Sequence, residues 1–406
     1  MKIDSTHCYR DPEMAMDEWL RTYLKEHRAD MFDLLRQLVC INSGSYNKSG
    51  VDAVGRVIAD ALADCDLTLD IIETKPFGNP LVFRTPCPST ETGQVLLVGH
   101  MDTVFQADTD FRDYREDANR AYGPGVVDMK GGLVAGIFAL KALSEAGLLK
   151  RLPLSFVLNG DEEIGSKWSR ALIRREAKKS ACAFVLEGGG LNGEVVIGRK
   201  GNLSARLTVA GRAGHAAFAG PDKTSAIVEL AHKILAIEAL NDFSAGILAN
   251  VGTVNGGIGP NTVAERAEAL LDFRFVQPED EDRLKTRLSQ ICAQIMVPGA
   301  AAELEIVSGR PPMPVSESNQ ALYDRVHRIA GRLGIAIHPE FRSGVSDANF
   351  IADAGIPVLD GLGPIGARDH SPDEYMLKES LPQRTLLLAA TLADYCGGEK
   401  PVPDLG

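Results

Sequence analysis

Short apolar runs alternate with helical stretches between residues 30 and 200. The run QVLLVG (94–99) is apolar over the length of a strand, which is typical of a strand buried in a sheet. In GGLVAGIFALKALSEAG (131–147) the apolar residues recur every three or four positions, which indicates a helix. The same patterns predict strands at 152–158 and 181–187, and helices at 31–41, 51–62 and 168–179. Strands that alternate with helices predict βαβ units, and hence an α/β domain whose mostly parallel sheet is flanked by helices.

A different order of elements begins near Gly201 and ends near Pro311. The pattern predicts a strand, a helix, two strands, a helix and a strand, at 203–211, 225–240, 246–257, 264–275, 278–296 and 303–309. This βαββαβ order is that of a ferredoxin-like α+β domain. Afterwards the first pattern resumes, with helices at 319–334 and 381–396 and a strand at 356–363. We therefore expect a small domain at 201–311, inserted into a larger domain made of 1–200 and 312–406.

The composition fits a globular protein with two domains and no nucleic-acid or membrane partner. A chain of 406 residues exceeds what one hydrophobic core usually holds. The formal net charge of -12, from 43 basic and 55 acidic residues, disfavours binding to nucleic acid. No run of 18 apolar residues and no signal-peptide core occurs, and the seven scattered cysteines form no CxxC pair. We expect a cytoplasmic protein, in which residues 1–27 carry no motif that assigns them a role.

Potential metal ligands follow four of the predicted strands. They are His100 and Asp102, the acidic triplet Asp161–Glu163, Glu187, and Asp369 with His370, while Asp128 stands on a glycine-rich turn before a helix. Taken alone, an acidic triplet is most often a solvated loop, and a single histidine is most often an ordinary turn residue. Because the ends of parallel strands meet at one edge of an open α/β sheet, we expect these residues to gather there.

A cluster of carboxylates at one edge needs a counter-charge. Two carboxylates about 4 Å apart repel by about 4 kcal/mol at an effective dielectric constant of 20, which is a large share of a stability of about 5–15 kcal/mol. Histidines mixed with carboxylates suit zinc, manganese or cobalt, whereas calcium and magnesium prefer oxygen ligands. The glycine-rich turn around Asp128 lacks the GxxxxGK[ST] order of a phosphate loop. The pattern therefore predicts a two-metal site with a bridging carboxylate.

The motifs GHMDTV, GPGVVDMKGG, NGDEEIGS, LEGG, GRAGHA and RDHSPDEY resemble, in the same order, those of the M20 family of metallopeptidases and acylases. The likeness is greatest to its glutamate carboxypeptidases and extends from about Leu34 to Ala393. It implies two divalent metal ions per chain, Zn²⁺ foremost, with Mn²⁺ or Co²⁺ as alternatives. The implied ligands are His100 and Glu187 for one metal, Glu163 and His370 for the other, and Asp128 as the bridge.

The resemblance also implies the roles of further residues. Glu162 is the general base that takes a proton from the attacking water. Asp102 hydrogen-bonds the far imidazole nitrogen of His100 and sets its tautomer. The peptide bond after Asp128 is expected to be cis. By the same resemblance the larger domain is the catalytic one.

The inserted domain resembles the family's lid and dimerisation domain, so a homodimer is expected. His215 then reaches the active site of the partner subunit and steadies the oxyanion. Asn261 and Arg274 match positions that contact substrate, and the arginine would clamp a carboxylate. Without the resemblance, the sequence pattern predicts that His215 is a turn residue at the end of a strand and that Arg274 is an exposed charge on a strand.

The reaction that the resemblance implies is hydrolysis of an amide bond next to a free carboxylate, with release of a C-terminal amino acid. Glu187, rather than an aspartate there, resembles the carboxypeptidase, deacetylase and desuccinylase branch. Expected substrates are N-acyl amino acids or short peptides, with glutamate as the favoured released residue. The alternative is a deacylase of the acetylornithine or succinyl-diaminopimelate type. An idle metal-stabilised binding protein is disfavoured by Glu162, and a dehydrogenase by the lack of GxGxxG after the first strand.

Overall fold

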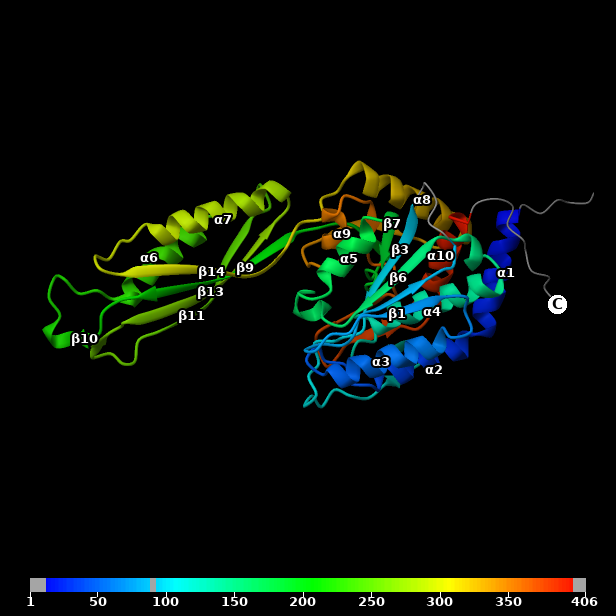
Figure 1. Cartoon of the computed structure of the whole chain (residues 1–406), viewed down its shortest axis with the longest axis horizontal. Coiled ribbons are helices and arrows are strands. Elements are labelled where there is room, and N and C mark those ends of the chain that lie inside the picture. Colours follow the sequence, from blue (N-terminus) through cyan, green and yellow to red (C-terminus); the bar gives the residue numbers. More distant parts are fainter. Residues whose placement is uncertain (1–11, 88–92, 397–406) are drawn as a thin grey trace, which may run out of the picture. The chain divides into compact units, whose positions relative to one another are not determined.

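The computed structural model describes residues 12–87 and 93–396, which form two compact units (Figure 1). The first, here called the α/β unit, comprises the chain up to 197 together with 316–340 and 354 onward. The second, here called the inserted unit, comprises 198–315 and 341–353. The segment 341–353 joins the inserted unit because the Asn349 amide donates to the carbonyls of Lys200 (2.9 Å) and Pro311 (2.8 Å).

A six-stranded mixed sheet forms the centre of the α/β unit, with strand order β1-β2-β6-β3-β7-β16. The strands are β1 (Thr68–Ile71), β2 (Leu81–Arg84), β3 (Gln94–His100), β6 (Leu154–Asn159), β7 (Ser180–Val185) and β16 (Val358–Leu359). The pairs β3–β6, β3–β7 and β7–β16 are parallel, as the alternation of strands and helices predicts. The β1–β2 and β2–β6 pairs are antiparallel, so an edge hairpin that the sequence pattern did not show completes the sheet.

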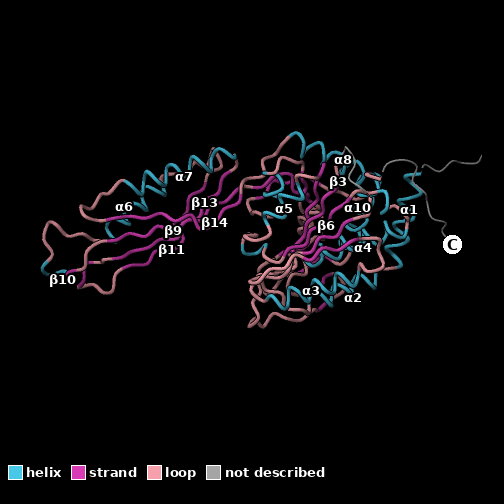
Figure 2. Tube along the Cα trace, viewed as in Figure 1, coloured by secondary structure: helices cyan, strands magenta, loops and turns pink. Residues whose placement is uncertain are grey.

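Helices flank this sheet, as the sequence predicts (Figure 2). They are α1 (Pro12–Glu26), α2 (Arg28–Val39), α3 (Lys48–Ala61), α4 (Lys130–Glu145), α5 (Arg170–Ala177), α8 (Glu317–Leu333) and α10 (Ser380–Asp394). Helix α4 packs against β3, and α2 and α10 pack against α4. Of residues 1–27, which had no assigned role, the first eleven lie outside the described residues, and α1 contributes the buried Trp19, Leu20 and Tyr23 to the main core. This helix therefore completes the α/β unit rather than the active site.

Helix α4 lies unusually close to the end of β7. A Cβ on Gly132 would come within 1.8 Å of the Leu186 carbonyl oxygen, and one on Gly136 within 2.7 Å of the Leu186 side chain. Only glycine allows so short a separation between a helix and a strand end. The N-terminus of α4, which follows Asp128, is thereby brought next to Glu187.

Several further elements are short. The strands β17 (Gly366–Ala367), β18 (Tyr375–Leu377), β5 (Arg120–Tyr122) and β4 (Arg115–Glu116) form a small sheet in that order. A two-stranded sheet pairs β8 (Glu194–Arg199) with β15 (His338–Arg342). The remaining short helices are η1 (Leu149–Arg151), η2 (Glu162–Ile164) and α9 (Ala348–Asp353). The small sheet joins the chain before Asp128 to the chain after His370.

The inserted unit has the ferredoxin-like fold that its element order predicts. Its antiparallel sheet runs β11-β13-β9-β14, with α6 (Ala226–Glu238) and α7 (Pro278–Ala293) packed on it and on each other (Figure 1). The strands are β9 (Gly201–Ala210), β11 (Leu248–Gly256), β13 (Arg266–Phe275) and β14 (Ala301–Arg310). Buried and half-buried residues alternate along β9, so one face of the sheet forms a second hydrophobic core beneath the helices. A short ladder of β10 (Gly214–His215) and β12 (Thr262–Val263) and the turn η3 (Ala216–Phe218) extend from it.

Among the described residues, no helix combines the length and the hydropathy needed to cross a membrane. The six cysteines in the described ranges are free thiols, whereas Cys8 lies outside those ranges.

Candidate metal centre and active site

Three parallel strands bring the candidate ligands to one edge of the sheet. Strand β3 ends at His100, β6 ends at Asn159 just before the acidic triplet, and β7 ends just before Glu187. Since β3 lies between β6 and β7, His100 lies between the two acidic segments. The sequence prediction that these side chains meet at the carboxyl ends of the strands is thus realised in the fold.

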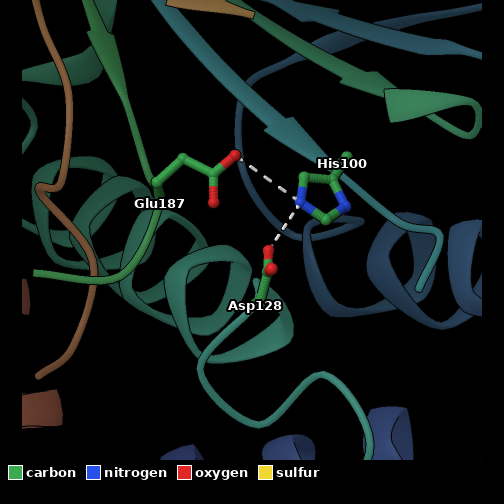
Figure 3. A group of neighbouring side chains, drawn as sticks. All are labelled: His100, Asp128 and Glu187. Carbon is green, nitrogen blue, oxygen red and sulfur yellow. Dashed lines mark hydrogen bonds and ion pairs between the residues drawn. The ribbon is translucent and has the colours of Figure 1, made fainter. Parts of the chain in front are cut away.

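The first ligand group consists of His100, Asp128 and Glu187 (Figure 3). The Nε2 atom of His100 lies 3.0 Å from Asp128 Oδ1 and 3.6 Å from Glu187 Oε1. One potential ligand atom from each residue lies within 4.8 Å of the others, which is close enough for one cation to bind all three. Both carboxylates are mostly buried, and His100 is fully buried.

The second ligand group lies on the other side of Asp128. Asp128 Oδ2 is 3.2 Å from His370 Nε2, and Glu163 Oε2 is also 3.2 Å from His370 Nε2. Asp128 therefore turns one oxygen to each histidine, which is the geometry of a bridging carboxylate. Asp369, which the sequence analysis counted among the potential metal ligands but which the family resemblance did not assign to a metal, also lies within ligand distance of Asp128 and His370.

The buried polar groups fit divalent cations. The Oε1 atom of Glu163 is buried and has no hydrogen-bond partner among the described residues, which is costly for a carboxylate oxygen. Burial and the nearby Asp128 raise the pKa of Glu163 to about 8. Burial and Asp128 likewise hold the pKa of Glu187 well above its usual range. A cation ligated by these carboxylates would supply the missing positive charge.

Hydrogen bonding between the histidines and the carboxylates shifts the remaining pKa values. Hydrogen bonds to Asp128 and Glu163 raise the pKa of His370 to about 11. Burial lowers the pKa of His100, but hydrogen bonds to Asp102 and Asp128 outweigh it and leave the pKa well above 6.5. Burial opposes ionisation of Asp128, but the two histidines hold its pKa well below the usual range. Protons and metal ions thus compete for the same atoms.

Asp102 orients two parts of the site at once. The Nδ1 atom of His100 lies 2.9 Å from the Asp102 carbonyl oxygen and 3.5 Å from its carboxylate. The nearest acceptor is thus the backbone carbonyl, whereas the carboxylate was expected. The carboxylate instead accepts hydrogen bonds from the backbone N–H groups of Glu162 (3.2 Å) and Glu163 (3.2 Å) and from the Ser45 hydroxyl (2.7 Å). It therefore holds the acidic triplet in place.

The members of the acidic triplet have different environments. Asp161 accepts hydrogen bonds from the Trp168 N–H (2.8 Å) and the Ser169 hydroxyl (2.5 Å), so it stabilises the turn before α5. Glu163 belongs to the second ligand group. Glu162 is buried and begins η2, and its charge contributes to the raised pKa values of both Glu163 and Glu187. A buried carboxylate close to the candidate ligands is suited to proton transfer.

The turn that carries Asp128 is held by a residue that the sequence analysis overlooked. The Glu374 carboxylate is buried and accepts hydrogen bonds from the N–H groups of Gly125 (2.9 Å), Val127 (2.9 Å) and Asp128 (3.1 Å). Successive N–H groups that converge in this way form an anion-binding nest. The Asp128–Met129 peptide bond is cis, as the family resemblance implied. The signal for Glu374 was its place four residues after His370, in the quoted motif RDHSPDEY.

We expect the substitution Glu374→Gln to weaken metal binding by about 10- to 100-fold, the usual effect of losing a group that orients a ligand. Glutamine keeps one acceptor oxygen but turns an amide NH₂ toward backbone N–H donors, so the Asp128 turn loses part of its support. Competition against a chelator of known affinity measures the change. Glu379→Gln is the matched control, because Glu379 is exposed and pairs with Arg28. Equal metal affinity in both variants would show that the nest does not position Asp128.

The three candidate residues of the inserted unit do not come together. His215 lies in β10 opposite Thr262, and the Ala216 N–H donates to the Asn261 carbonyl (2.9 Å), so His215 and Asn261 are neighbours. Arg274 lies near the end of β13 and donates to Asp272 (2.9 Å). The β10–β12 ladder extends from the other end of the sheet, where β13 begins (Figure 1). Within this unit, the residues expected to contact substrate therefore lie in two separate places, with His215 and Asn261 in one and Arg274 in the other.

The sequence matches a known family over most of its length. Residues 96–394 match the sequence model of peptidase family M20/M25/M40. Carboxypeptidase G2 of Pseudomonas sp. (strain RS-16) is 28% identical over 376 residues, covering 90% of this chain and 89% of that protein. Succinyl-diaminopimelate desuccinylase of Stutzerimonas stutzeri (strain A1501) is 26% identical over 360 residues, covering 84% of this chain and 91% of that protein.

Solved structures share the fold. Aminopeptidase PepT from Bacillus cereus superposes with a TM-score of 0.76 at 21% identity, covering 91% of this chain and 99% of that chain. The M20 family metallo-carboxypeptidase Sso-CP2 from Sulfolobus solfataricus superposes with a TM-score of 0.71 at 18% identity, covering 90% and 99%. At these identities the likeness is one of fold.

Proposed function

Because the chain belongs to peptidase family M20/M25/M40, we propose that it is a di-metal amidohydrolase that cleaves an amide bond next to a free carboxylate and releases a C-terminal amino acid. Its relatives make it a hydrolase of a metal-dependent family. The observation that supports the reaction most directly is Asp128, with one oxygen near His100 and the other near His370.

In this proposal the chain binds two divalent cations, which the position of Asp128 between the two histidines supports. One would be held by His100, Asp128 and Glu187, and the other by Asp128, Glu163 and His370. Mixed nitrogen and oxygen ligands suit Zn²⁺, with Mn²⁺ or Co²⁺ as alternatives. When bound, the cations supply a water of lowered pKa and polarise the scissile carbonyl.

Glu162 is the general base in this proposal. Its backbone N–H is held by Asp102, which also contacts His100, so the base and a metal ligand share one support. Glu162 takes a proton from the attacking water and delivers it to the nitrogen of the leaving amine. This transfer needs a carboxylate close to the metal ligands, and the contribution of the Glu162 charge to the raised pKa values of Glu163 and Glu187 supports such a position.

The substrates in this proposal are N-acyl amino acids or short peptides. Arg274 and Asn261 contact the substrate, and the arginine pairs with its carboxylate. Glutamate is the favoured released residue. The alternative is an N-acyl-amino-acid deacylase, which the desuccinylase relatives favour to a similar degree. The free thiols support a cytoplasmic location.

Metal content combined with a substrate panel tests the proposal. Purified protein is assayed for bound metals and incubated with N-acyl amino acids that differ in both halves, and mass spectrometry identifies both products. The carboxypeptidase hypothesis is supported if the protein binds two metals per chain and releases one preferred amino acid from substrates with different acyl groups. Cleavage restricted to one acyl group, such as acetyl or succinyl, supports the deacylase. Failure to cleave any amide bond contradicts both.

We further propose that the inserted unit forms a homodimer. Strand β11 is an edge strand of its sheet, and an edge with free backbone groups is suited to pairing with another chain. Val254 on β11 is 53% exposed, and Leu235 on the adjacent α6 is 72% exposed. Exposed apolar residues on an edge strand and its covering helix favour a two-fold interface. In such a dimer His215 serves the active site of the partner subunit.

We expect His215→Ala to lower kcat by about 10²- to 10³-fold, the usual cost of losing one oxyanion donor, with normal metal content. The reason is that His215 belongs to neither ligand group of the described residues. His338→Ala, at an exposed histidine of β15, is the matched control. Steady-state kinetics and metal analysis measure both variants.

Mixing two inactive variants tests whether His215 acts across subunits. In a heterodimer of His215→Ala and Glu162→Gln, one active site receives an intact base and an intact histidine. Statistical exchange between two-fold dimers then restores about one quarter of wild-type activity. If His215 serves its own subunit, mixing restores nothing, and the cross-subunit role is wrong.

A further inference from the structure

Three aromatic side chains from separate segments form a row on the α/β unit, in which the two outer rings are exposed and the middle ring is half-buried. Tyr46 lies before α3, Phe77 between β1 and β2, and Trp168 before α5. The ring centroids of Tyr46 and Phe77 are 5.9 Å apart, and those of Phe77 and Trp168 are 6.3 Å apart. Tyr46 is 67% exposed and Trp168 58% exposed, although such rings usually bury most of their surface. We call these residues the aromatic row.

Each member of the aromatic row is attached to the segment that carries Glu162. The backbone N–H of Trp168 donates to the carboxylate of Asp161, one residue before Glu162. Tyr46 follows Ser45, whose hydroxyl donates to Asp102, and Asp102 accepts from the Glu162 N–H. Two of the three rings therefore stand on segments that are linked by hydrogen bonds to the Glu162 segment.

Phe77 lies next to the same segment because the backbones of Gly78 and Gly160 are in close contact. A Cβ placed on Gly160, two residues before Glu162, would lie 3.3 Å from the Cα atom of Gly78. The two backbones are thus in close contact, and Phe77 is the residue before Gly78. All three rings accordingly stand on loops that touch the strand end of β6 or its Asp102 support.

The loops under the row are held by polar contacts. Lys48 donates to the Asn79 side chain (2.7 Å), which joins the loop of Tyr46 to that of Phe77. The Asn79 N–H donates to Asp52 of α3 (2.7 Å), and the Asp52 carboxylate also pairs with Lys48 (3.0 Å). Little conformational freedom remains to be lost when a ligand packs on the rings, which favours binding.

We propose that the aromatic row is the subsite for the acyl half of the substrate and that it takes a planar aromatic acyl group. This inference rests on the proposed function. Hydrolysis at the site divides the substrate into a charged amino-acid half and an acyl half. The row offers apolar, tilted rings on loops that are linked to the acidic triplet, whose negative charge would repel a substrate carboxylate. Rings inclined by 54° and 55° to one another allow stacked and edge-to-face contacts with one planar group.

Trp168 reports on this subsite directly. The chain has two tryptophans, and Trp19 is only 6% exposed in the core of the α/β unit. In the variant Trp19→Phe with Glu162→Gln, Trp168 is the sole tryptophan and turnover is suppressed. We expect an N-benzoyl amino acid to change its fluorescence saturably, with affinity about ten-fold above that of the N-acetyl derivative of the same amino acid. Equal affinity for the two derivatives, or no response to the benzoyl ligand, would overturn the subsite.

Kinetics provides the second measurement. For Tyr46→Ala, Phe77→Ala and Trp168→Ala, we expect the ratio of kcat/KM for benzoyl over acetyl substrates to fall about ten-fold. Ile71→Ala, at a 57% exposed apolar residue of β1, is the control and should keep the wild-type ratio. An unchanged ratio in the three row variants means that the rings only support their loops, and the inference is wrong.

The two proposals fail in different ways. If wild-type protein cleaves benzoyl and acetyl substrates and neither the fluorescence nor the ratio distinguishes them, the reaction stands and the aromatic row is not a subsite. If no substrate is cleaved but Trp168 still reports selective binding of the benzoyl ligand, the row is a binding site and the proposed reaction is wrong.

Discussion

Glu162→Gln lowers kcat by about 10²- to 10⁴-fold, the usual contribution of a general base, and leaves metal binding intact. Glutamine has nearly the shape of glutamate but cannot accept the proton of the attacking water. The proposed metal ligands are other residues, and Asp102 holds position 162 by its backbone N–H, so we expect the substitution to leave the ligand groups in place. The measurement is kcat on any cleaved N-acyl amino acid together with metal content by elemental analysis.

The control for this variant is Glu73→Gln, at an exposed glutamate of the α/β unit. Its kcat and metal content should match those of the wild type. Turnover within a few-fold of wild type in Glu162→Gln would remove Glu162 from the proposed mechanism. A loss of both turnover and bound metal would instead indicate that Glu162 is a metal ligand. That result would contradict the proposal that Glu163 binds a metal while Glu162 acts as the base.

Removal of divalent cations with a chelator abolishes hydrolysis, and Zn²⁺, Mn²⁺ or Co²⁺ restores it. The reason is that the water and the scissile carbonyl are activated by the cations, while the chain itself supplies the ligands and the base. Assays after exhaustive dialysis against chelator, followed by addition of each metal, measure the effect. Hydrolysis by metal-free protein would contradict a metal mechanism.

Metal binding to the metal-free protein can also be measured without an activity assay. In the absence of metal the pKa of His370 is raised to about 11 and that of Glu163 to about 8, so both hold protons at pH 7. A metal binds only the deprotonated ligands, and binding therefore releases protons. Metal affinity should consequently rise from pH 6 to pH 8. Calorimetry in two buffers of different ionisation enthalpy counts the protons, and a pH-independent affinity would show that these ligands do not bind the metal.

The long elements of the fold were predictable from sequence periodicity. Helices such as α4 and α7 and strands such as β3 and β13 begin and end close to the expected positions. Each is long enough for its apolar pattern to repeat several times. Strands of two or three residues, such as β17 and β18, contain too few residues for any period to show. The antiparallel β1 and β2 were missed because pairing partners, rather than local pattern, decide how an edge strand joins a sheet.

The chemical types of the candidate ligands were also readable from the sequence. His100 and Glu187 directly follow buried apolar runs, and Glu163 comes five residues after the end of another. Parallel strands place such residues at a common edge. Their order along the chain was enough to identify the family, which residues 96–394 confirm. The sequence could not show which atoms meet, since that depends on strand order.

By itself, then, the sequence determined the order of elements, the two-domain α/β and ferredoxin-like architecture, and the histidines and carboxylates available at the strand ends. Only the tertiary structure decided that Asp128 faces both histidines, that Glu374 supports its turn from 246 positions away, and that three aromatic rings from separate segments gather into one row. The physical reason is the range of the interactions. Periodicity and strand ends are local properties of the chain, whereas a nest, a bridge and an aromatic row join segments that only packing brings together.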